Sequence, residues 1–190
     1  MRLIIVDGLD GCGKDTQADL IRRKYEKKGE KVIVRSHPES DNFFGRRTKK
    51  ALLGEGKLNK IRASIYYMLD VLRSIRIYYR RKDVDTLIMV RYLVGTAYLP
   101  TRLAIIGYKF FSGFVPMSDY MFFLDSPPEE LIKRMEGREQ KEMFETIALL
   151  RKVRKKALML VKDYIVIDAS RTINQTHKNI DKKLTNLDKN

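Results

Sequence analysis

Residues 8–17, GLDGCGKDTQ, decide the fold predicted for this chain. Glycines at positions 8, 11 and 13 allow a tight turn and let backbone N–H groups approach an anion, and Lys14 adds a cation beside it. The apolar run LIIV (3–6) precedes the turn and a helical pattern follows it. The segment therefore predicts a phosphate-binding loop between a first strand and a first helix. Its expected phosphate ligands are Gly8, Asp10, Gly11, Cys12, Gly13, Lys14, Asp15 and Thr16.

The residue after Lys14 breaks the usual pattern of such a loop. In G-x-x-x-x-G-K-[ST] the last position carries a hydroxyl that binds Mg²⁺, whereas this chain has Asp15. Two interpretations stay open. The carboxylate replaces the hydroxyl as a metal ligand, or it caps the first turn of the helix, whose dipole favours negative charge there. In the second case the metal is held by the phosphates and Asp10.

Apolar runs alternate with helical patterns along the whole chain. Strands are predicted at 3–6, 31–36, 86–90, 120–125 and 164–168. Helices are predicted at 16–28, 43–53, 93–112, 127–136, 141–162 and 172–184. A further long helix should end near residue 82, with Ile61, Ile65, Leu69, Leu72 and Tyr79 along one face. The pattern predicts a single α/β domain over residues 1–190: a five-stranded parallel sheet flanked by helices on both faces, with ligands beyond the carboxyl ends of the strands.

The composition restricts the class of protein. Hydrophobic residues make up 44% and charged residues 33% of the chain, which is typical of a globular protein. The apolar stretch 93–115 contains Arg102 and Lys109, so we expect no membrane span. The single cysteine excludes an intramolecular disulfide, and the first residues show no signal-peptide pattern, so we expect a cytoplasmic location.

The charge of the chain is strongly basic. The formal net charge is +15, and residues 46–82 hold twelve Lys or Arg against two acidic residues. Such a field attracts polyanions, either nucleotide phosphates or nucleic acid. A basic but merely solvated surface is the alternative, so charge alone does not choose a function.

Beyond the glycine-rich loop, the chain resembles the thymidylate kinases, a family of P-loop nucleoside monophosphate kinases. GLDGCGKDTQ is similar to the family's G-L-D-G-x-G-K-T-T-Q. FVPMSDYMFFLDSPPEELIKRM (114–135) is similar to its fourth strand and the helix before its lid, MFETIALLRKVRKKAL (143–158) to the helix after the lid, and YIVIDASRTINQTHKNI (164–180) to its last strand and helix. The resemblance covers most of the chain. It implies a P-loop NTPase fold with a short arginine-bearing lid at about 134–144.

The resemblance also implies a reaction, cofactors and partners. These are transfer of the ATP γ-phosphate to dTMP, giving dTDP, with ATP and Mg²⁺, and a homodimer in which the stretch 93–111 is a candidate interface. The implied catalytic residues are Lys14, Arg91, Arg134 and Arg138. The implied acceptor-binding residues are Asp10, Pro38, Tyr67, Arg91 and Tyr98, with Tyr67 stacked on the base and Tyr98 near the sugar. The plainer alternatives are core positions for both tyrosines and a solvated helix face for the lid arginines.

Four positions depart from the family pattern. Asp15 replaces the hydroxyl residue, and Val90 replaces an aspartate before the strand-three arginine. Val71 stands where an arginine contacts the base, and Ser36 where an arginine reaches the acceptor phosphate. Arg35 lies one position away, and a one-residue shift on an extended segment reverses the direction of a side chain. The basic residues that could supply the missing charge are Arg46, Arg47 and Arg73.

The first two departures suggest an exchange of metal ligands. The hydroxyl has become a carboxylate and the strand-three carboxylate has become valine, so the local charge is unchanged. We hypothesise that Asp15 takes over both roles, since Mg²⁺ prefers oxygen ligands. The other two departures leave the identity of the acceptor open.

Three functions therefore remain in competition. The first is a thymidylate kinase-like phosphotransferase with nucleotide substrates, and the second is a kinase for another nucleoside monophosphate or small phosphorylated acceptor. The third is a non-catalytic relative that binds nucleotide or nucleic acid through its basic face. The retained Lys14, Arg91, Arg134 and Arg138 favour the first two over the third.

Overall fold

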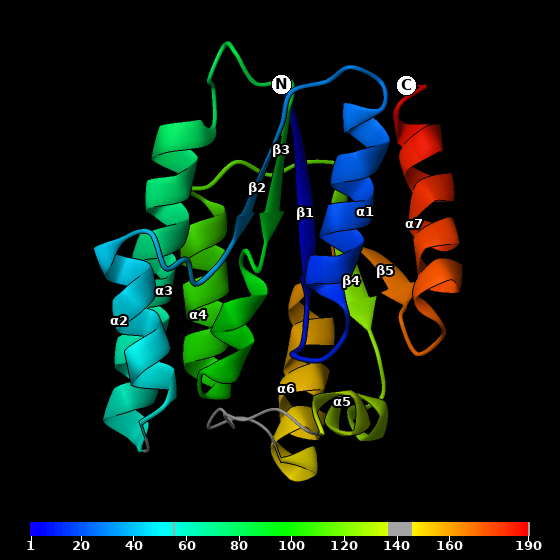
Figure 1. Ribbon diagram of the computed structural model, residues 1–190. Coiled ribbons are helices and arrows are strands. Elements are labelled where there is room, and N and C mark those ends of the chain that lie inside the picture. The colour runs from blue at the N-terminus through cyan, green and yellow to red at the C-terminus, as the bar shows by residue number, and fades with distance from the viewer. Residues whose placement is uncertain (55, 137–145, 190) are drawn as a thin grey trace.

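The sheet of the protein has the predicted architecture. A computed structural model describes residues 1–54, 56–136 and 146–189 (Figure 1). Its strands are β1 (Arg2–Gly8), β2 (Val32–Ser36), β3 (Thr86–Val90), β4 (Met121–Asp125) and β5 (Ile165–Asp168). All neighbouring pairs are parallel, in the order β2-β3-β1-β4-β5. The five predicted strands and their parallel arrangement are confirmed.

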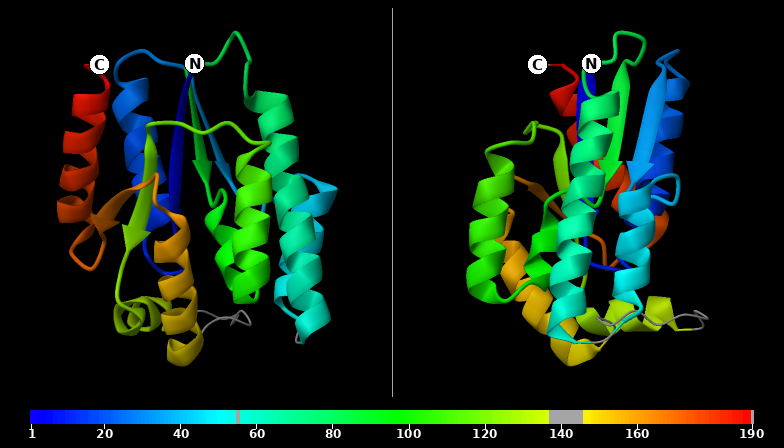
Figure 2. Two further views of the ribbon diagram at one scale, coloured as in Figure 1. Left: turned by 180° about the vertical axis from the view of Figure 1, so that it is seen from behind. Right: turned by 90° about the vertical axis from the view of Figure 1, so that its left-hand side faces the viewer.

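Helices cover both faces of this sheet. They are α1 (Lys14–Glu26), α2 (Phe43–Leu52), α3 (Lys57–Tyr78), the 3₁₀ helix η1 (Val94–Tyr98), α4 (Thr101–Ser112), α5 (Pro128–Met135), α6 (Ile147–Leu160) and α7 (Ile173–Leu187). Helices α1 and α7 lie on the face seen in Figure 1. Helices α3, α4 and α6 lie on the opposite face, seen from behind in Figure 2, and α2 packs along α3. No helix among the described residues is long and apolar enough to cross a membrane.

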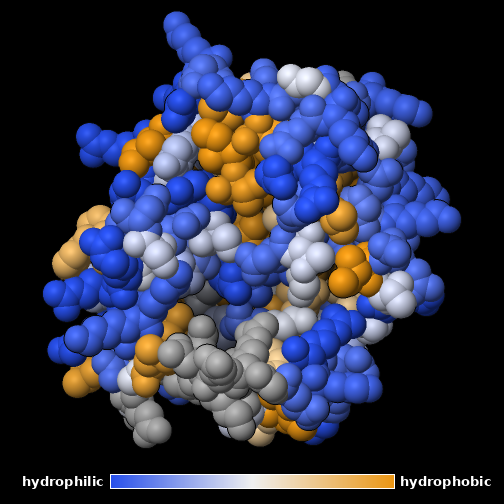
Figure 3. Space-filling model, in the orientation of Figure 1, coloured by the Kyte–Doolittle hydropathy of each residue, from blue (hydrophilic) through white to orange (hydrophobic). Residues whose placement is uncertain are grey.

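The central strands explain why the sheet needs two helical layers. All five residues of β3 are buried, and so are the last six residues of β1. A strand with apolar side chains on both faces is stable only when both faces are covered. The edge strand β2 is only partly buried. Accordingly, Figure 3 shows a mainly hydrophilic front surface with a hydrophobic area at the upper centre, over β2 and between α3 and α1.

The strand register brings three connections to one edge of the sheet. Val90 lies opposite Val6 of β1 and opposite Ser36 of β2, so β2 and β3 end at the same level and β1 ends two residues further on, at Gly8. The glycine-rich loop, Gly8–Asp15, therefore faces the segments that follow β2 and β3; we call it the P-loop. Helix α5 packs beneath it: a Cβ on Gly11 would lie 2.9 Å from the Leu131 carbonyl oxygen. Figure 1 shows both termini at the other end of the molecule.

Two predictions about the helices were wrong in detail. The stretch 93–112 is not one helix, because Leu99 is extended and Pro100 precedes α4. Proline lacks an N–H group and restricts the residue before it, so the helical ladder stops there. Helix α3 ends at Tyr78 rather than near residue 82, and Arg80 has a positive φ of 77°.

The apolar face predicted for α3 is not its core face. Ile61, Ile65 and Leu69 are 41%, 54% and 37% exposed. The helix instead packs against the protein through a row that contains Tyr67, Val71 and buried polar residues such as Asp70 and Ser74. Apolar periodicity located a face of the helix, but it could not tell a core face from a solvent-exposed one.

Candidate functional site

The P-loop has the backbone conformation that an anion site requires. Gly11 and Gly13 adopt φ angles of 83° and 87°, a region that side chains disfavour, and Gly13 is the N-cap of α1. The N–H groups of the first turn of α1 therefore face the loop, and the helix dipole adds positive potential there. Lys14 is 2% exposed; its Nζ donates to the Leu9 carbonyl at 2.9 Å and lies 3.2 Å from Asp10 Oδ1.

Arg91 joins the P-loop to the ends of β2 and β3. Its Nη1 lies 3.2 Å from Asp15 Oδ2 and 3.2 Å from Ser36 Oγ, and its Nη2 lies 3.4 Å from Asp10 Oδ1. The Ser36 hydroxyl also donates a short hydrogen bond to Asp15. We call Asp10, Asp15, Ser36 and Arg91 the Arg91 cluster. It brings together residues that lie up to 81 positions apart in the sequence.

The two carboxylates of this cluster are held in their charged form. Burial by itself raises the pKa of Asp10, but the nearby Lys14 and Arg91 outweigh it and the pKa falls well below its usual range. For Asp15 burial acts in the same upward direction, and the Arg91 charge with the Ser36 hydrogen bond lowers the pKa overall. Both side chains are therefore available as anionic oxygen ligands at neutral pH.

A buried carboxylate that the sequence reasoning missed positions this arginine. Asp7 Oδ2 accepts the backbone N–H groups of Tyr92, Leu93 and Val94 at 3.1, 3.1 and 3.2 Å. Burial raises the pKa of Asp7, while the backbone hydrogen bonds oppose that rise. Asp7 thus fixes the segment directly after Arg91. An acidic residue at the end of the apolar run LIIV was the signal that could have revealed it.

A pocket of about 710 Å³ opens beside the Arg91 cluster. We call it the side pocket. Residues that line it include Asp10, Ser36, Pro38, Lys49, Lys60, Tyr67, Arg91 and Tyr98. The predicted acceptor-binding residues, Asp10, Pro38, Tyr67, Arg91 and Tyr98, therefore all border one space. This volume is in the range of small-molecule sites.

The two tyrosines of the side pocket are fixed by hydrogen bonds. Tyr67 donates through its hydroxyl to the Tyr92 carbonyl at 3.1 Å, and Tyr98 donates to Asp10 Oδ2 at 2.9 Å. The Tyr67 ring lies against Gly95, where a Cβ would come within 2.6 Å of its Cε1. Glycine at position 95 thus leaves room for the ring against the backbone. Both tyrosines are partly core residues, and they also border the pocket.

The segment after β2 forms another wall of the side pocket. Asp70 of α3 accepts the Glu39 backbone N–H at 2.8 Å and the Asn42 side-chain amide at 2.7 Å. Asn42 in turn caps α2 by accepting the Gly45 N–H at 3.0 Å. A Cβ on Gly45 would lie 1.8 Å from the Glu39 carbonyl oxygen, so only glycine permits this close packing. One buried carboxylate on α3 therefore sets the position of both the loop and α2.

Comparison with known proteins identifies the family to which this site belongs. The family model described as thymidylate kinase matches residues 6–180. The chain belongs to the thymidylate kinase family. Known relatives include a protein of Thermococcus gammatolerans named probable thymidylate kinase, 29% identical with 93% of this chain and 92% of the relative covered. A protein of Saccharolobus solfataricus named probable thymidylate kinase 1 is 30% identical, with 92% of each chain covered.

A solved thymidylate kinase shares the fold. The structure from Candida albicans superposes with a TM-score of 0.79, covering 98% of this chain and 92% of that one, at 18% sequence identity. At this level of identity the likeness supports the architecture rather than the role of any residue. The P-loop NTPase fold that the family resemblance implied is thereby confirmed.

Arg134, one of the arginines expected in the lid of this thymidylate kinase-family chain, bonds to the segment after β5. The Arg134 guanidinium donates to the carbonyls of Ala169, Ser170 and Arg171, at 2.9, 3.1 and 3.3 Å, in the segment after β5. Arg138 and most of the predicted lid, 134–144, lie outside the described residues. Thr16 follows Asp15 in α1 and is exposed.

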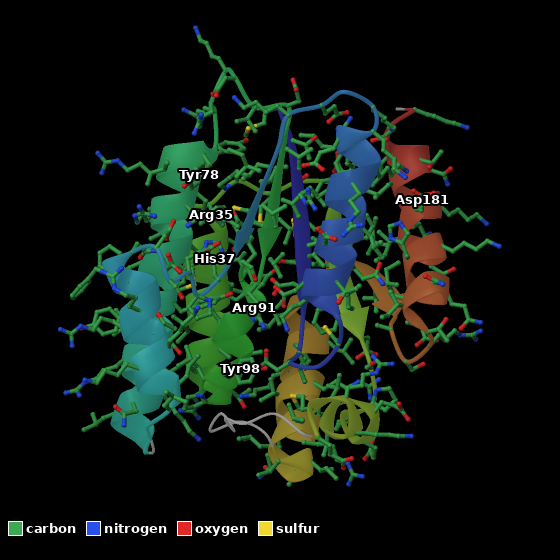
Figure 4. The ribbon with its side chains drawn as sticks, in the orientation of Figure 1. Arg35, His37, Tyr78, Arg91, Tyr98 and Asp181 are labelled. Atoms are coloured by element: carbon green, nitrogen blue, oxygen red, sulfur yellow. The ribbon has the colours of Figure 1, made fainter. Side chains whose placement is uncertain are left out.

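Arg35 does not replace the arginine missing at Ser36. Its guanidinium pairs with Asp41 at 2.8 Å and lies over the Tyr78 ring, 4.8 Å from the centroid. Figure 4 shows Arg35 beside Tyr78, farther from the P-loop end of the sheet than Arg91 and Tyr98. The inference that a one-residue shift reverses the side chain is consistent with this position.

His37, on this wall of the pocket, should make the free energy of unfolding depend on pH. Its Nε2 contacts Ser74 Oγ at 2.9 Å and its Nδ1 contacts the Val90 carbonyl at 3.2 Å. Burial lowers the pKa of His37 from 6.5 to about 4, although the nearby Asp70 opposes the shift. Protons then bind the unfolded chain preferentially, so the free energy of unfolding should fall as the pH drops from 7 to 4, by about 3 kcal/mol at most.

Denaturant unfolding at a series of pH values tests this response. His37→Gln should flatten the fall between pH 6.5 and 4.5, whereas His177→Gln, at a partly exposed histidine on α7, should change it less. An unchanged slope in His37→Gln would show that another group carries the effect.

Proposed function

We propose that this protein is a thymidylate kinase that transfers the γ-phosphate of ATP to dTMP and yields dTDP. One observation carries the proposal: the Arg91 cluster lies where the P-loop meets the side pocket, so donor and acceptor phosphates can approach the same guanidinium. Family membership supplies the reaction class. We also propose that the chain works as one kinase domain in the cytoplasm.

Different residues bind the two substrates. P-loop N–H groups, the amino end of α1 and Lys14 bind the ATP phosphates. The acceptor enters the side pocket with its base against Tyr67 and its sugar near Tyr98, so that its phosphate faces Arg91. A phosphate oxygen of dTMP then bonds to the γ-phosphorus as the bond to the ADP oxygen breaks. The acceptor is already anionic, so positioning and charge neutralisation matter more than a general base.

Lid arginines belong to this proposal as well. Arg138 and the segment 134–144 are proposed to close over the transferring phosphoryl group. Arg134 reaches that position only by giving up its three hydrogen bonds to the segment after β5. Its contribution therefore requires the Arg134 side chain to change conformation.

The two carboxylates of the Arg91 cluster, Asp10 and Asp15, are suitable ligands for Mg²⁺. No group of three His, Cys, Asp or Glu side chains within the described residues could hold a metal ion by itself. Mg²⁺, however, commonly binds one or two carboxylates together with substrate phosphates and water. Asp15 and Asp10 are the carboxylates that border the P-loop, and we propose Asp15 as the protein ligand. The bound ion would neutralise phosphate charge during transfer.

The identity of the acceptor base is the least constrained part of the proposal. Val71, which stands in place of a base-contacting arginine, is fully buried and does not line the side pocket. Ser64 and Thr48 are polar residues that do line it. A kinase for another nucleoside monophosphate is therefore the second candidate, and a non-catalytic nucleotide- or nucleic acid-binding protein is the third.

Turnover with a panel of acceptors tests the function. Purified protein with ATP and Mg²⁺ should release ADP fastest with dTMP, compared with dUMP, dCMP, dGMP and AMP, and excess EDTA should abolish release. Lys14→Met should lower turnover at least about 100-fold, because a cation on the transferring phosphates is lost. Faster turnover of another monophosphate would replace dTMP as the acceptor. Absence of ADP release with every acceptor, together with salt-dependent DNA binding, would support the non-catalytic alternative.

An exposed apolar surface supports the predicted homodimer. Ile61 and Ile65 of α3 lie near exposed residues of α4, among them Ile106 and Phe110, which are 64% and 58% exposed. A groove of about 300 Å³ runs between the two helices, and its lining is almost entirely apolar. Figure 2 shows these helices side by side on the rear of the molecule. We propose that a second copy of the chain covers this face, since large apolar patches on proteins mark interaction sites.

Charge placed on this face should separate the two copies. Ile106→Lys is expected to convert a dimer to a monomer in analytical ultracentrifugation at micromolar concentration, because it buries an unpaired ammonium group. Ile173→Lys, at a similarly exposed position on α7, serves as the control and should leave the dimer intact. A wild-type protein that sediments as a monomer would rule out this interface.

A further inference from the structure

The side pocket needs more positive charge than Arg91 supplies. A nucleoside monophosphate carries close to two negative charges, whereas Arg91 already faces the carboxylates of Asp10 and Asp15. The Ser36 hydroxyl, which stands in place of an arginine, adds no charge. An acceptor phosphate entering the pocket therefore meets a cation that is shared with two anions.

The arginines considered from the sequence do not solve this problem. Arg46 donates to the Ser40 carbonyl at 3.2 Å, Arg47 lies over the Phe43 ring, and Arg73 lies 3.8 Å from Asp41. None of the three lines the side pocket. The cationic residues that do line it, among those the structure describes, are Lys49, Lys60 and Arg91.

Lys49 has the geometry of an anion ligand. It projects from α2, and its Nζ donates to Ser40 Oγ at 2.6 Å, on the loop that also lines the pocket. An ammonium group has three donors, and this bond uses one of them. Its partner is a neutral hydroxyl, and no carboxylate of the described chain lies within ion-pair distance of Lys49. The hydroxyl orients the lysine without neutralising it.

The acidic residues near Lys49 are already paired with other groups. Glu39 and Asp41 both pair with the Arg35 guanidinium, at 3.4 and 2.8 Å. Asp10 pairs with Lys14 as well as with Arg91. The carboxylates of Glu39 and Asp41 are therefore held by Arg35 and not by the Lys49 ammonium group.

We infer that Lys49 binds the phosphate of the acceptor together with Arg91 and replaces the charge lost at Ser36. The inference rests on the proposed function, because it assigns a ligand within the acceptor site. Lys49 is a specificity residue for a phosphorylated acceptor, since its contact is with the phosphate and not with the base or sugar. Lys49 influences ATP and the transition state only through the acceptor that it binds.

Equilibrium binding separates this role from a structural one. Calorimetric titration with dTMP and with thymidine, which lacks the phosphate, should be compared in wild type, Lys49→Met and Lys50→Met. Lys50 is an exposed neighbour on α2 that does not line the pocket. Lys49→Met should weaken dTMP binding roughly 10- to 100-fold, as expected for loss of a charged hydrogen bond. Thymidine binding should be unchanged, and Lys50→Met should resemble wild type for both ligands.

Two further variants test whether Lys49 acts directly. Lys49→Arg should recover most of the dTMP affinity, because it restores the charge. Ser40→Ala removes the hydroxyl partner and keeps the ammonium group, so dTMP affinity should change less than about threefold. An equal loss of dTMP and thymidine binding in Lys49→Met, or a Ser40→Ala effect as large as that of Lys49→Met, would make Lys49 a structural residue and overturn the inference.

The outcomes also separate this inference from the proposed function. Wild-type protein that binds dTMP, with Lys49→Met binding it equally well, leaves the kinase assignment in place and refutes the role of Lys49. Wild-type protein that binds no dTMP refutes both.

Discussion

The ion cluster of Arg91 with Asp10 and Asp15 is the constraint on which the site depends. It joins the P-loop to the ends of β2 and β3, and it does so because these strands end at the same level in the sheet. Asp7 holds the segment directly after Arg91 through three backbone N–H groups. The guanidinium is thus fixed from its backbone and from its partners before any substrate is bound. Preorganised charge of this kind is what phosphoryl transfer requires of a protein.

The same cluster explains how the chain tolerates its departures from the family pattern. Asp15 adds a carboxylate on α1 where a hydroxyl is usual, while Val90 is fully buried in β3. Ser36 is compatible with the carboxylate at position 15. Its small hydroxyl bonds to Asp15, where an arginine would form an ion pair with it. The positive charge removed from β2 is then needed elsewhere on the side pocket. The departures at positions 15 and 36 are physically connected through Arg91.

The sequence predicted those parts of the structure that depend on local chemistry. Glycine spacing and Lys14 defined the P-loop, since a backbone turn and a helix end require only neighbouring residues. Continuous apolar runs predicted the parallel sheet because both faces of its central strands are buried. The sequence also indicated that Arg35 does not replace the arginine missing at position 36, because the alternation of side chains along a strand is a local property too.

The remaining features depend on contacts that no local pattern encodes. Apolar spacing on α3 marked Ile61 and Ile65, yet these residues face solvent, because periodicity is the same for a core and for an interface. The role proposed for Lys49 could not be predicted from the sequence. It depends on a hydroxyl nine residues away and on a pocket wall built by several segments. The break in the stretch 93–112 is an exception, because the local rule for proline at Pro100 was enough to predict it.

The central claim is that Asp15 supplies the metal-binding carboxylate that this chain lacks at position 90. The most direct measurement is the Mg²⁺ concentration that gives half-maximal phosphoryl transfer, at saturating substrates, in wild type, Asp15→Thr and Asp15→Thr with Val90→Asp. Thermal unfolding confirms that each variant is folded. The account predicts that Asp15→Thr raises this concentration at least about tenfold, and that adding Val90→Asp returns it to within about threefold of wild type. Equal Mg²⁺ dependence in all three proteins would contradict it.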